Sequence, residues 1–149
     1  MATFGAERGR DEVILAARIL IIVLFVVFGW SKLTDYSGTV GYMAQTGSPV
    51  PSISALVAIV VEIVVALAVA LGAWTRPLAL LLALYTLGTG LIAHHFWTME
   101  GAVRYANAIN FYKNISIAGG FLLLYVTGAG RYSIDAKRGS KLGAKPHSI

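Results

Sequence analysis

One carboxyl group stands in the middle of a long apolar run. Glu62 is surrounded by valines and isoleucines, and an ionisable residue inside such a segment marks a functional site by default. Small residues recur at four-residue steps on its face, at Ser54, Ala58, Ala66 and Ala70, which predicts that Glu62 points toward other helices. Two interpretations stay open: a structural ion pair or protonated acid, and a carboxylate that exchanges protons or anchors a ligand.

Two cations share one face of the first apolar run. Arg18, Phe25, Gly29 and Lys32 recur at helical spacing, so Arg18 and Lys32 are expected on the same side of a helix. Arg18 is the natural partner for Glu62, but an arginine near the end of a span also snorkels to the headgroups. Lys32 is interpreted as an interfacial anchor or as a member of the site.

Two histidines end the third apolar run, and His95 is a second candidate for proton exchange beside Glu62. Adjacent helical residues point about 100° apart, so His94 and His95 cannot both face one ligand unless the helix ends there. The third histidine, His147, is far away in the tail. A two-histidine metal or haem site therefore lacks ligands, and no metal site is predicted.

A polar pocket is predicted in the outer half of the molecule, narrowing inward to the glutamate. Such a pocket suits an amphipathic small molecule, and a quinone needs donors at its carbonyls and an apolar slot for its tail. No covalent cofactor is expected, and the catalytic residues are unknown beyond the two proton-exchange candidates. The candidate ligand-binding residues are Arg18, Lys32, Glu62, His94, His95, Lys113 and Asn114.

The amino-acid composition indicates that the segments carrying these residues lie in lipid and not in water. Of the 149 residues, 57% are hydrophobic and 13% charged, against about a quarter charged in a soluble domain. A chain this short cannot hide so much apolar surface in its own core, which excludes a soluble globular domain and a disordered chain. The absence of cysteine excludes disulfides and thiolate metal sites.

The apolar runs predict an all-α integral membrane protein, an antiparallel bundle of four transmembrane helices. The spans are expected at about 13–33, 53–74, 77–97 and 106–129, within a membrane domain of residues 13–130. Residues 1–12 form an N-terminal segment and residues 131–149 a basic tail, and the stretch from Thr34 to Ser52 is expected as a surface loop.

The distribution of basic residues predicts the orientation. The formal net charge is +5, and most Lys and Arg residues fall on the side that holds both termini. Both termini are therefore expected in the cytoplasm. The basic tail is interpreted as an anchor near anionic lipid, and no nucleic-acid partner is expected.

A series of polar residues and glycines runs from Arg18 to about Asp135. The series comprises Arg18, Phe28-Gly29-x-x-Lys32-Leu33, Gly47 and Pro51, Glu62, Gly72 followed by Arg76, His95-Phe96, and Asn114 followed by Gly119-Gly120. This pattern resembles the DoxX family of small four-span membrane proteins. Ala66 and Ala68 stand where the family often has glycines after the glutamate.

The resemblance implies a multi-pass protein of the bacterial inner membrane, associated with quinone-linked oxidoreduction or with an accessory role. It leads to two functional expectations. In the first, the chain is a quinone-binding subunit of an oxidoreductase, whose electrons come from a redox partner. In the second, it is a non-enzymatic anchor or assembly factor, docked through its basic tail. The expected partners are the lipid bilayer and a redox partner protein or a second copy of the chain.

Overall fold

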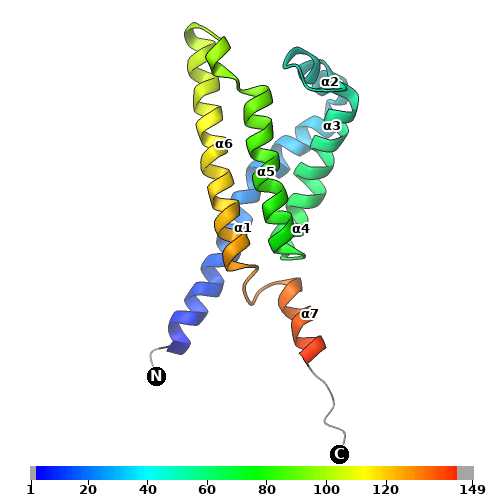
Figure 1. Cartoon of the computed structure of the whole chain (residues 1–149). Helices are drawn as coiled ribbons and strands as arrows, with labels where there is room; N and C mark the ends of the chain where they lie inside the picture. Colours follow the sequence, from blue (N-terminus) through cyan, green and yellow to red (C-terminus); the bar gives the residue numbers. More distant parts are fainter. Residues whose placement is uncertain (1–2, 144–149) are drawn as a thin grey trace, which may run out of the picture.

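The computed structural model describes the backbone of residues 3–143 and the side chains of residues 9–139. The ends of the predicted N-terminal segment and basic tail, with Lys145 and His147, lie outside this part. The described chain is helical, as predicted (Figure 1). The helices are α1 (Thr3–Thr34), α2 (Tyr36–Gln45), α3 (Pro51–Ile59), the π-helical turn η1 (Val60–Val65), α4 (Ala66–Leu71), α5 (Thr75–Ala93), the 3₁₀ turn η2 (Phe96–Thr98), α6 (Gly101–Thr127) and α7 (Ile134–Gly143).

Three helical stretches are long and apolar enough to cross a membrane. They cover Gly9–Thr34, Pro51–Leu71 and Thr75–Thr98. Large apolar side chains point outward along them, and Leu20 is 72% exposed, which a soluble protein would avoid. The chain is therefore an all-α integral membrane protein. The fourth span and the side of the termini stay predictions.

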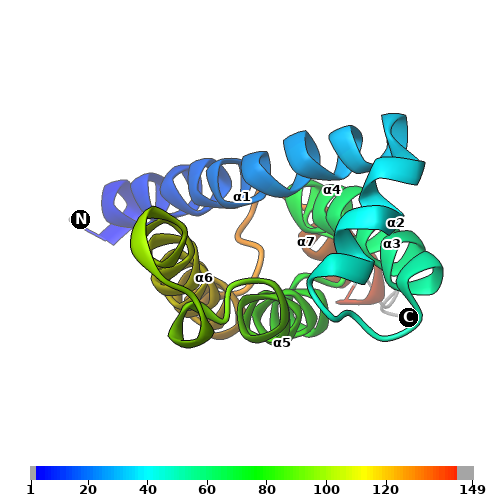
Figure 2. The same cartoon turned by 90° about the horizontal axis from the view of Figure 1, so that it is seen from above.

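The helices form a bundle in which α5 and α6 run side by side and α1 crosses them (Figures 1 and 2). The second long helix, formed by α3, η1 and α4, packs along α1. A shared core lies in the middle, where the rings of Phe25 on α1 and Phe121 on α6 meet edge to face at 5.4 Å. Val69 and Leu82 are fully buried beside them.

The segment expected as a surface loop from Thr34 to Ser52 contains the helix α2 instead. Asp35 caps this helix, because its carboxylate accepts a hydrogen bond from the backbone N–H of Gly38 at 3.0 Å. The three glycines and two prolines of the segment suggested a loop, but the two prolines and Gly47 fall after the helix. The prediction failed because the local cap outweighs two helical glycines.

The segment after α6 folds back onto the turn between α4 and α5. The Asp135 carboxylate accepts hydrogen bonds from the backbone N–H groups of Trp74 at 2.8 Å and Thr75 at 2.9 Å, and so caps α5. Partial burial works against the ionised carboxylate, but these bonds and nearby Arg138 hold the pKa of Asp135 below its usual range. In return, the Asp135 N–H donates to the Gly72 carbonyl at 2.9 Å. The first part of the predicted tail is thus an ordered element.

Candidate functional site

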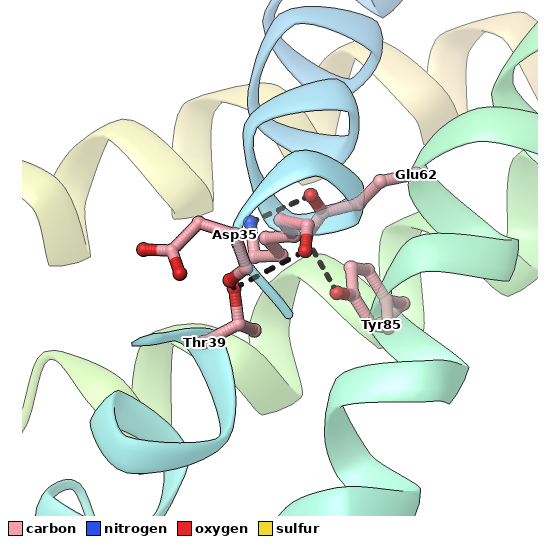
Figure 3. A network of polar contacts seen from close by, with 5 residues as sticks. Asp35, Thr39, Glu62 and Tyr85 are labelled. Carbon is pink, nitrogen blue, oxygen red and sulfur yellow. Dashed lines mark hydrogen bonds and ion pairs between the residues drawn. The ribbon is translucent and has the colours of Figure 1, made fainter. Parts of the chain in front are cut away.

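Glu62 lies at the centre of a buried polar cluster and both of its carboxylate oxygens have partners. The Lys32 ammonium donates to Oε2 at 2.7 Å, and the Tyr85 hydroxyl donates to Oε1 at 2.7 Å. Figure 3 shows the Tyr85 hydroxyl directed at the Glu62 carboxylate. Three long helices therefore meet at one carboxylate: α1 through Lys32, the π turn through Glu62 and α5 through Tyr85.

The π-helical turn gives Glu62 its place in the bundle. The six residues Val60–Val65 widen the long helix locally, and such turns are frequent at functional sites. Glu62 is only 7% exposed, so the turn presents a charged side chain to the protein interior and not to lipid. Both oxygens of this carboxylate thus have a hydrogen-bond donor at this depth.

A glycine allows α1 to approach this turn closely. A Cβ atom added at Gly29 would lie 2.9 Å from the Glu62 Cβ and 2.9 Å from the Ile63 Cγ1, closer than real Cβ contacts. Gly29 and Lys32 are one turn apart on the same face, so the close contact brings the ammonium within reach of the carboxylate.

Helix α2 covers the cluster at the end of the bundle that lies away from the chain termini (Figure 1). The Thr39 hydroxyl donates to the Asp35 carbonyl at 2.8 Å and lies 3.4 Å from the Lys32 carbonyl. The Asp35 carboxylate points away from Glu62 in Figure 3, which agrees with its role as the cap of α2. Asp35 therefore caps α2, whereas Glu62 forms the ion pair of the cluster with Lys32.

The two predicted histidines lie beyond the end of α5, at Ala93. The His94 Nδ1–H donates to the Asn107 side-chain oxygen at 2.9 Å, and the His95 Nδ1–H donates to the Ile92 carbonyl at 2.8 Å. In the tautomer that donates through Nδ1, the Nε2 atom of each ring is left as a hydrogen-bond acceptor.

An aromatic cluster holds the connection that carries these histidines. Phe96 packs against Trp97 and Phe111 at 5.5 Å between ring centroids, and the Arg104 guanidinium lies 5.6 Å from the Phe96 ring. Aromatic and cation–π contacts therefore hold together the end of α5 and the start of α6.

The two predicted residues on α6 differ in their surroundings. Asn114 is half-buried and packs against Gly90 of α5, where an added Cβ would lie 3.3 Å from its Nδ2. Lys113 is exposed and donates to the Asn110 side chain on its own helix at 2.8 Å. Asn114 thus faces the bundle, whereas Lys113 lies on the surface of α6 and bonds to Asn110.

Arg18 lies at the other end of the bundle and does not meet Glu62. Its side chain is completely buried, and it donates to the Tyr132 carbonyl in the segment after α6. Arg18 and Lys32 are fourteen residues apart, about 21 Å along a helix. Since α1 and α4 run antiparallel, Arg18 lies beside Gly72, while Lys32 reaches Glu62. Of the two cations, the structure pairs the glutamate with Lys32.

The sequence model of the DoxX family matches residues 13–95 of this chain. The chain belongs to the DoxX family. The matched region contains Lys32, Glu62 and Tyr85, the whole buried cluster, and also Arg18.

The relatives of this DoxX protein agree with a membrane location. It is 48% identical over 134 residues to the inner membrane protein YphA of Escherichia coli, covering 90% of this chain and 94% of YphA. It is 43% identical over 126 residues to the inner membrane protein YqjF of the same organism, covering 85% of this chain and 92% of YqjF. The DoxX protein is therefore a multi-pass protein of the bacterial inner membrane.

A more distant relative comes from yeast. The ER-derived vesicles protein ERV29 of Saccharomyces cerevisiae is 26% identical over 132 residues, which are 89% of this chain but 36% of ERV29. No solved structure matches the chain.

Sequence reasoning missed Tyr85, which supplies the second hydrogen bond to the DoxX protein's central carboxylate. A tyrosine among leucines in a membrane span looks like an ordinary apolar residue. The available signal was its hydroxyl, because a buried tyrosine normally directs its O–H at a partner. Ser133 and Asp135, which surround Arg18 and the start of α5, were also missed as partners of the membrane helices.

Proposed function

We propose that this DoxX-family protein binds an amphipathic small molecule, of the quinone type, at the Lys32–Glu62–Tyr85 cluster and supports a redox partner. The observation that carries the proposal is the buried ion pair on a π-helical turn inside a membrane bundle. Removing two charges from water is costly and a bilayer protein retains such a pair chiefly where it serves a function.

The proposal includes four spans with both termini in the cytoplasm. Helix α6 has 27 residues, enough for about 40 Å, and packs along α5 (Figure 1). The start of α1, the α4–α5 turn and α7 all gather at one end of the bundle. That end carries most of the positive charge, which favours the cytoplasmic side. The basic residues there include Arg10, Arg76, Arg131, Lys137 and Arg138, against Lys32, Arg104 and Lys113 toward the other end.

The cluster has hydrogen-bonding capacity to spare. Lys32 carries three N–H donors and gives one to Glu62, and the Tyr85 oxygen accepts as well as donates. Lys32 is also more accessible than Glu62, with 22% of its side chain exposed against 10% for Glu62. A carbonyl oxygen of the ligand would therefore bind at the lysine, while the glutamate keeps the lysine in place.

The apolar core supports access from the outer side. Phe25 and Phe121 meet at 5.4 Å and are both buried, so they separate the outer cluster from Arg18 at the inner end. His94, His95 and Asn114 lie on the outer side of this division. Protons exchanged at Glu62 would consequently pass to the outer side through groups such as the histidine Nε2 atoms.

In this proposal the protein's residues handle binding and protons, not electrons. Reduction of a quinone to the quinol takes up two electrons and two protons, and a partner protein would deliver the electrons. Glu62 and Lys32 would hold or release protons next to the bound head group.

The function is tested by the quinone content of the purified protein. Protein extracted in mild detergent is analysed for quinones by mass spectrometry, beside Glu62→Gln and His95→Ala variants. Glu100→Gln is the matched control, because Glu100 is exposed at the outer end and belongs to no cluster. We expect stoichiometric quinone in the parent protein and in the control, and loss in Glu62→Gln.

Equal quinone in all four samples, at the level of an unrelated four-span protein, would reject the proposal.

The alternative is a non-enzymatic membrane anchor, which helix α7 favours because its residues 136–139 are exposed at the end of the bundle. For that role, removal of residues 136–149 would abolish capture of the partner, and Glu62→Gln would have little effect.

A further inference from the structure

Two hollows flank the C-terminal end of α6, at the end of the bundle away from the polar cluster. The first lies between α1 and α6 and is lined by Arg10, Val13, Ile14, Val126 and Thr127. The second lies between the start of α5 and the segment after α6, and its lining includes Arg76, Thr127 and Gly128. Thr127 lines both, so the two hollows adjoin.

The first hollow is an apolar groove with a cation at its mouth. Val13 and Val126, on its two sides, are 67% and 68% exposed, and Ile14 forms the floor. Arg10 is exposed and stands one turn before Val13, toward the water. A phospholipid has a charged headgroup followed by apolar acyl chains. The guanidinium of Arg10, with the apolar groove about one helix turn further along, has the same order of charged and apolar parts.

The second hollow supplies another guanidinium. Arg76 lies against Gly128, where an added Cβ would be 3.3 Å from its Nε. Within the described residues, neither Arg10 nor Arg76 forms an ion pair, whereas Lys32 does. The Asp135 carboxylate, which also lines this hollow, is engaged by the backbone N–H groups of Trp74 and Thr75.

We propose that these hollows form a binding site for an anionic phospholipid. The headgroup phosphate lies between Arg10 and Arg76 beside Thr127, and an acyl chain lies in the groove between Val13 and Val126. Guanidinium groups bind phosphate through charge-assisted hydrogen bonds, and basic pockets between membrane helices take anionic headgroups. The site is separate from the proposed quinone site and does not depend on it.

Native mass spectrometry of the full chain with added phosphatidylglycerol or phosphatidylcholine tests the proposal. The parent protein is expected to retain phosphatidylglycerol in preference to phosphatidylcholine. Arg10→Gln and Arg76→Gln should each weaken phosphatidylglycerol binding about fivefold, the effect of one basic residue near a membrane surface. Val126→Trp, which fills the exposed groove, should weaken binding of both lipids.

Arg131→Gln is the matched control. It removes the same charge from the same end, but Arg131 lines neither hollow and its guanidinium lies 6.0 Å from the Tyr132 ring. We expect phosphatidylglycerol binding in this variant to stay within twofold of the parent. An equal loss in all three arginine variants would show diffuse surface charge and overturn the site, as would equal binding of the two lipids. Unchanged binding in Val126→Trp would overturn the acyl groove.

Discussion

At the scale of single residues, the central fact is that Lys32 and Glu62 depend on each other. A buried ion pair contributes little net stability, but removal of one partner leaves an uncompensated charge. We therefore expect Lys32→Met to lower the free energy of unfolding by about 3–5 kcal/mol. The double variant Lys32→Met, Glu62→Gln should recover most of that loss. Thermal unfolding in detergent, followed by circular dichroism, measures both.

Lys113→Met is the control for this double-variant cycle. Lys113 is exposed and bonded only to Asn110 on its own helix, so its replacement should change stability by less than about 0.5 kcal/mol. If Lys32→Met proves as mild as the control, the pair is not a buried and coupled unit.

The charged residues of the membrane helices could be predicted from the sequence, but the partner of Glu62 could not. Charge within an apolar run is visible in any sequence, and it singled out Arg18, Lys32 and Glu62. The choice between the two cations depends on the register of α1 against the π turn and on the close approach at Gly29. Neither feature leaves a pattern in the spacing of charges, so the partner of Glu62 stayed open.

At the scale of helices, Gly29 sets the distance between α1 and the π turn. Gly29→Ala places a Cβ 2.9 Å from both Glu62 and Ile63, so the helices must move apart. We expect a loss of about 1–3 kcal/mol, typical of overpacking, together with a weaker Lys32–Glu62 pair. Stability in detergent should fall, and with it the quinone content that the proposed function predicts.

Gly119→Ala provides the control for the effect of glycine itself. Gly119 is also helical, but nothing lies within 4 Å of an added Cβ. This substitution should leave stability unchanged or raise it by about 0.5–1 kcal/mol, because alanine favours helix. A similar loss in both variants would show that helix propensity, and not the close contact, explains the effect.

The cap on α5 should make stability depend on pH. The pKa of Asp135 is lowered in the folded state, so its stabilising effect is fully present above its unfolded pKa of about 4. It is lost as pH falls through the lower folded value. Asp135→Asn should cost about 1 kcal/mol at pH 7 and flatten the acid limb of the stability curve. An acid limb identical to that of the parent would contradict this role.

At the scale of the whole molecule, the sequence was enough for the helical membrane class but not for the last segment. Long apolar runs with few charges permit few folds in lipid, so the class follows from composition alone. The segment after α6 has no such signal: it is polar and basic, and was interpreted as a tail that anchors near anionic lipid. Its order comes from contacts with Arg18, Gly72 and Trp74, which are distant in sequence.

This segment and the buried arginine should therefore fold as one unit. The native chain has no cysteine, so a single Ser133→Cys variant reports on the segment through its reaction with maleimide. Ser133 is 5% exposed and its Cβ lies close to the Arg18 guanidinium, so labelling should be slow in the folded protein. Adding Arg18→Gln removes the donor to the Tyr132 carbonyl and should speed labelling at least about fivefold, since that bond contributes about 1 kcal/mol or more.

Three comparisons make the result specific to this contact. Gly139→Cys, on the exposed side of α7, should react quickly with or without Arg18→Gln. Removal of residues 140–149 should leave labelling at Ser133→Cys slow, because Tyr132, Asp135 and Arg138 remain. Ending the chain after Gly130 should lower the free energy of unfolding, because the Arg18 guanidinium then loses its acceptor, the Tyr132 carbonyl, and α5 loses its cap, Asp135. Slow labelling in the Arg18→Gln variant would instead show that Asp135 alone holds the segment in place.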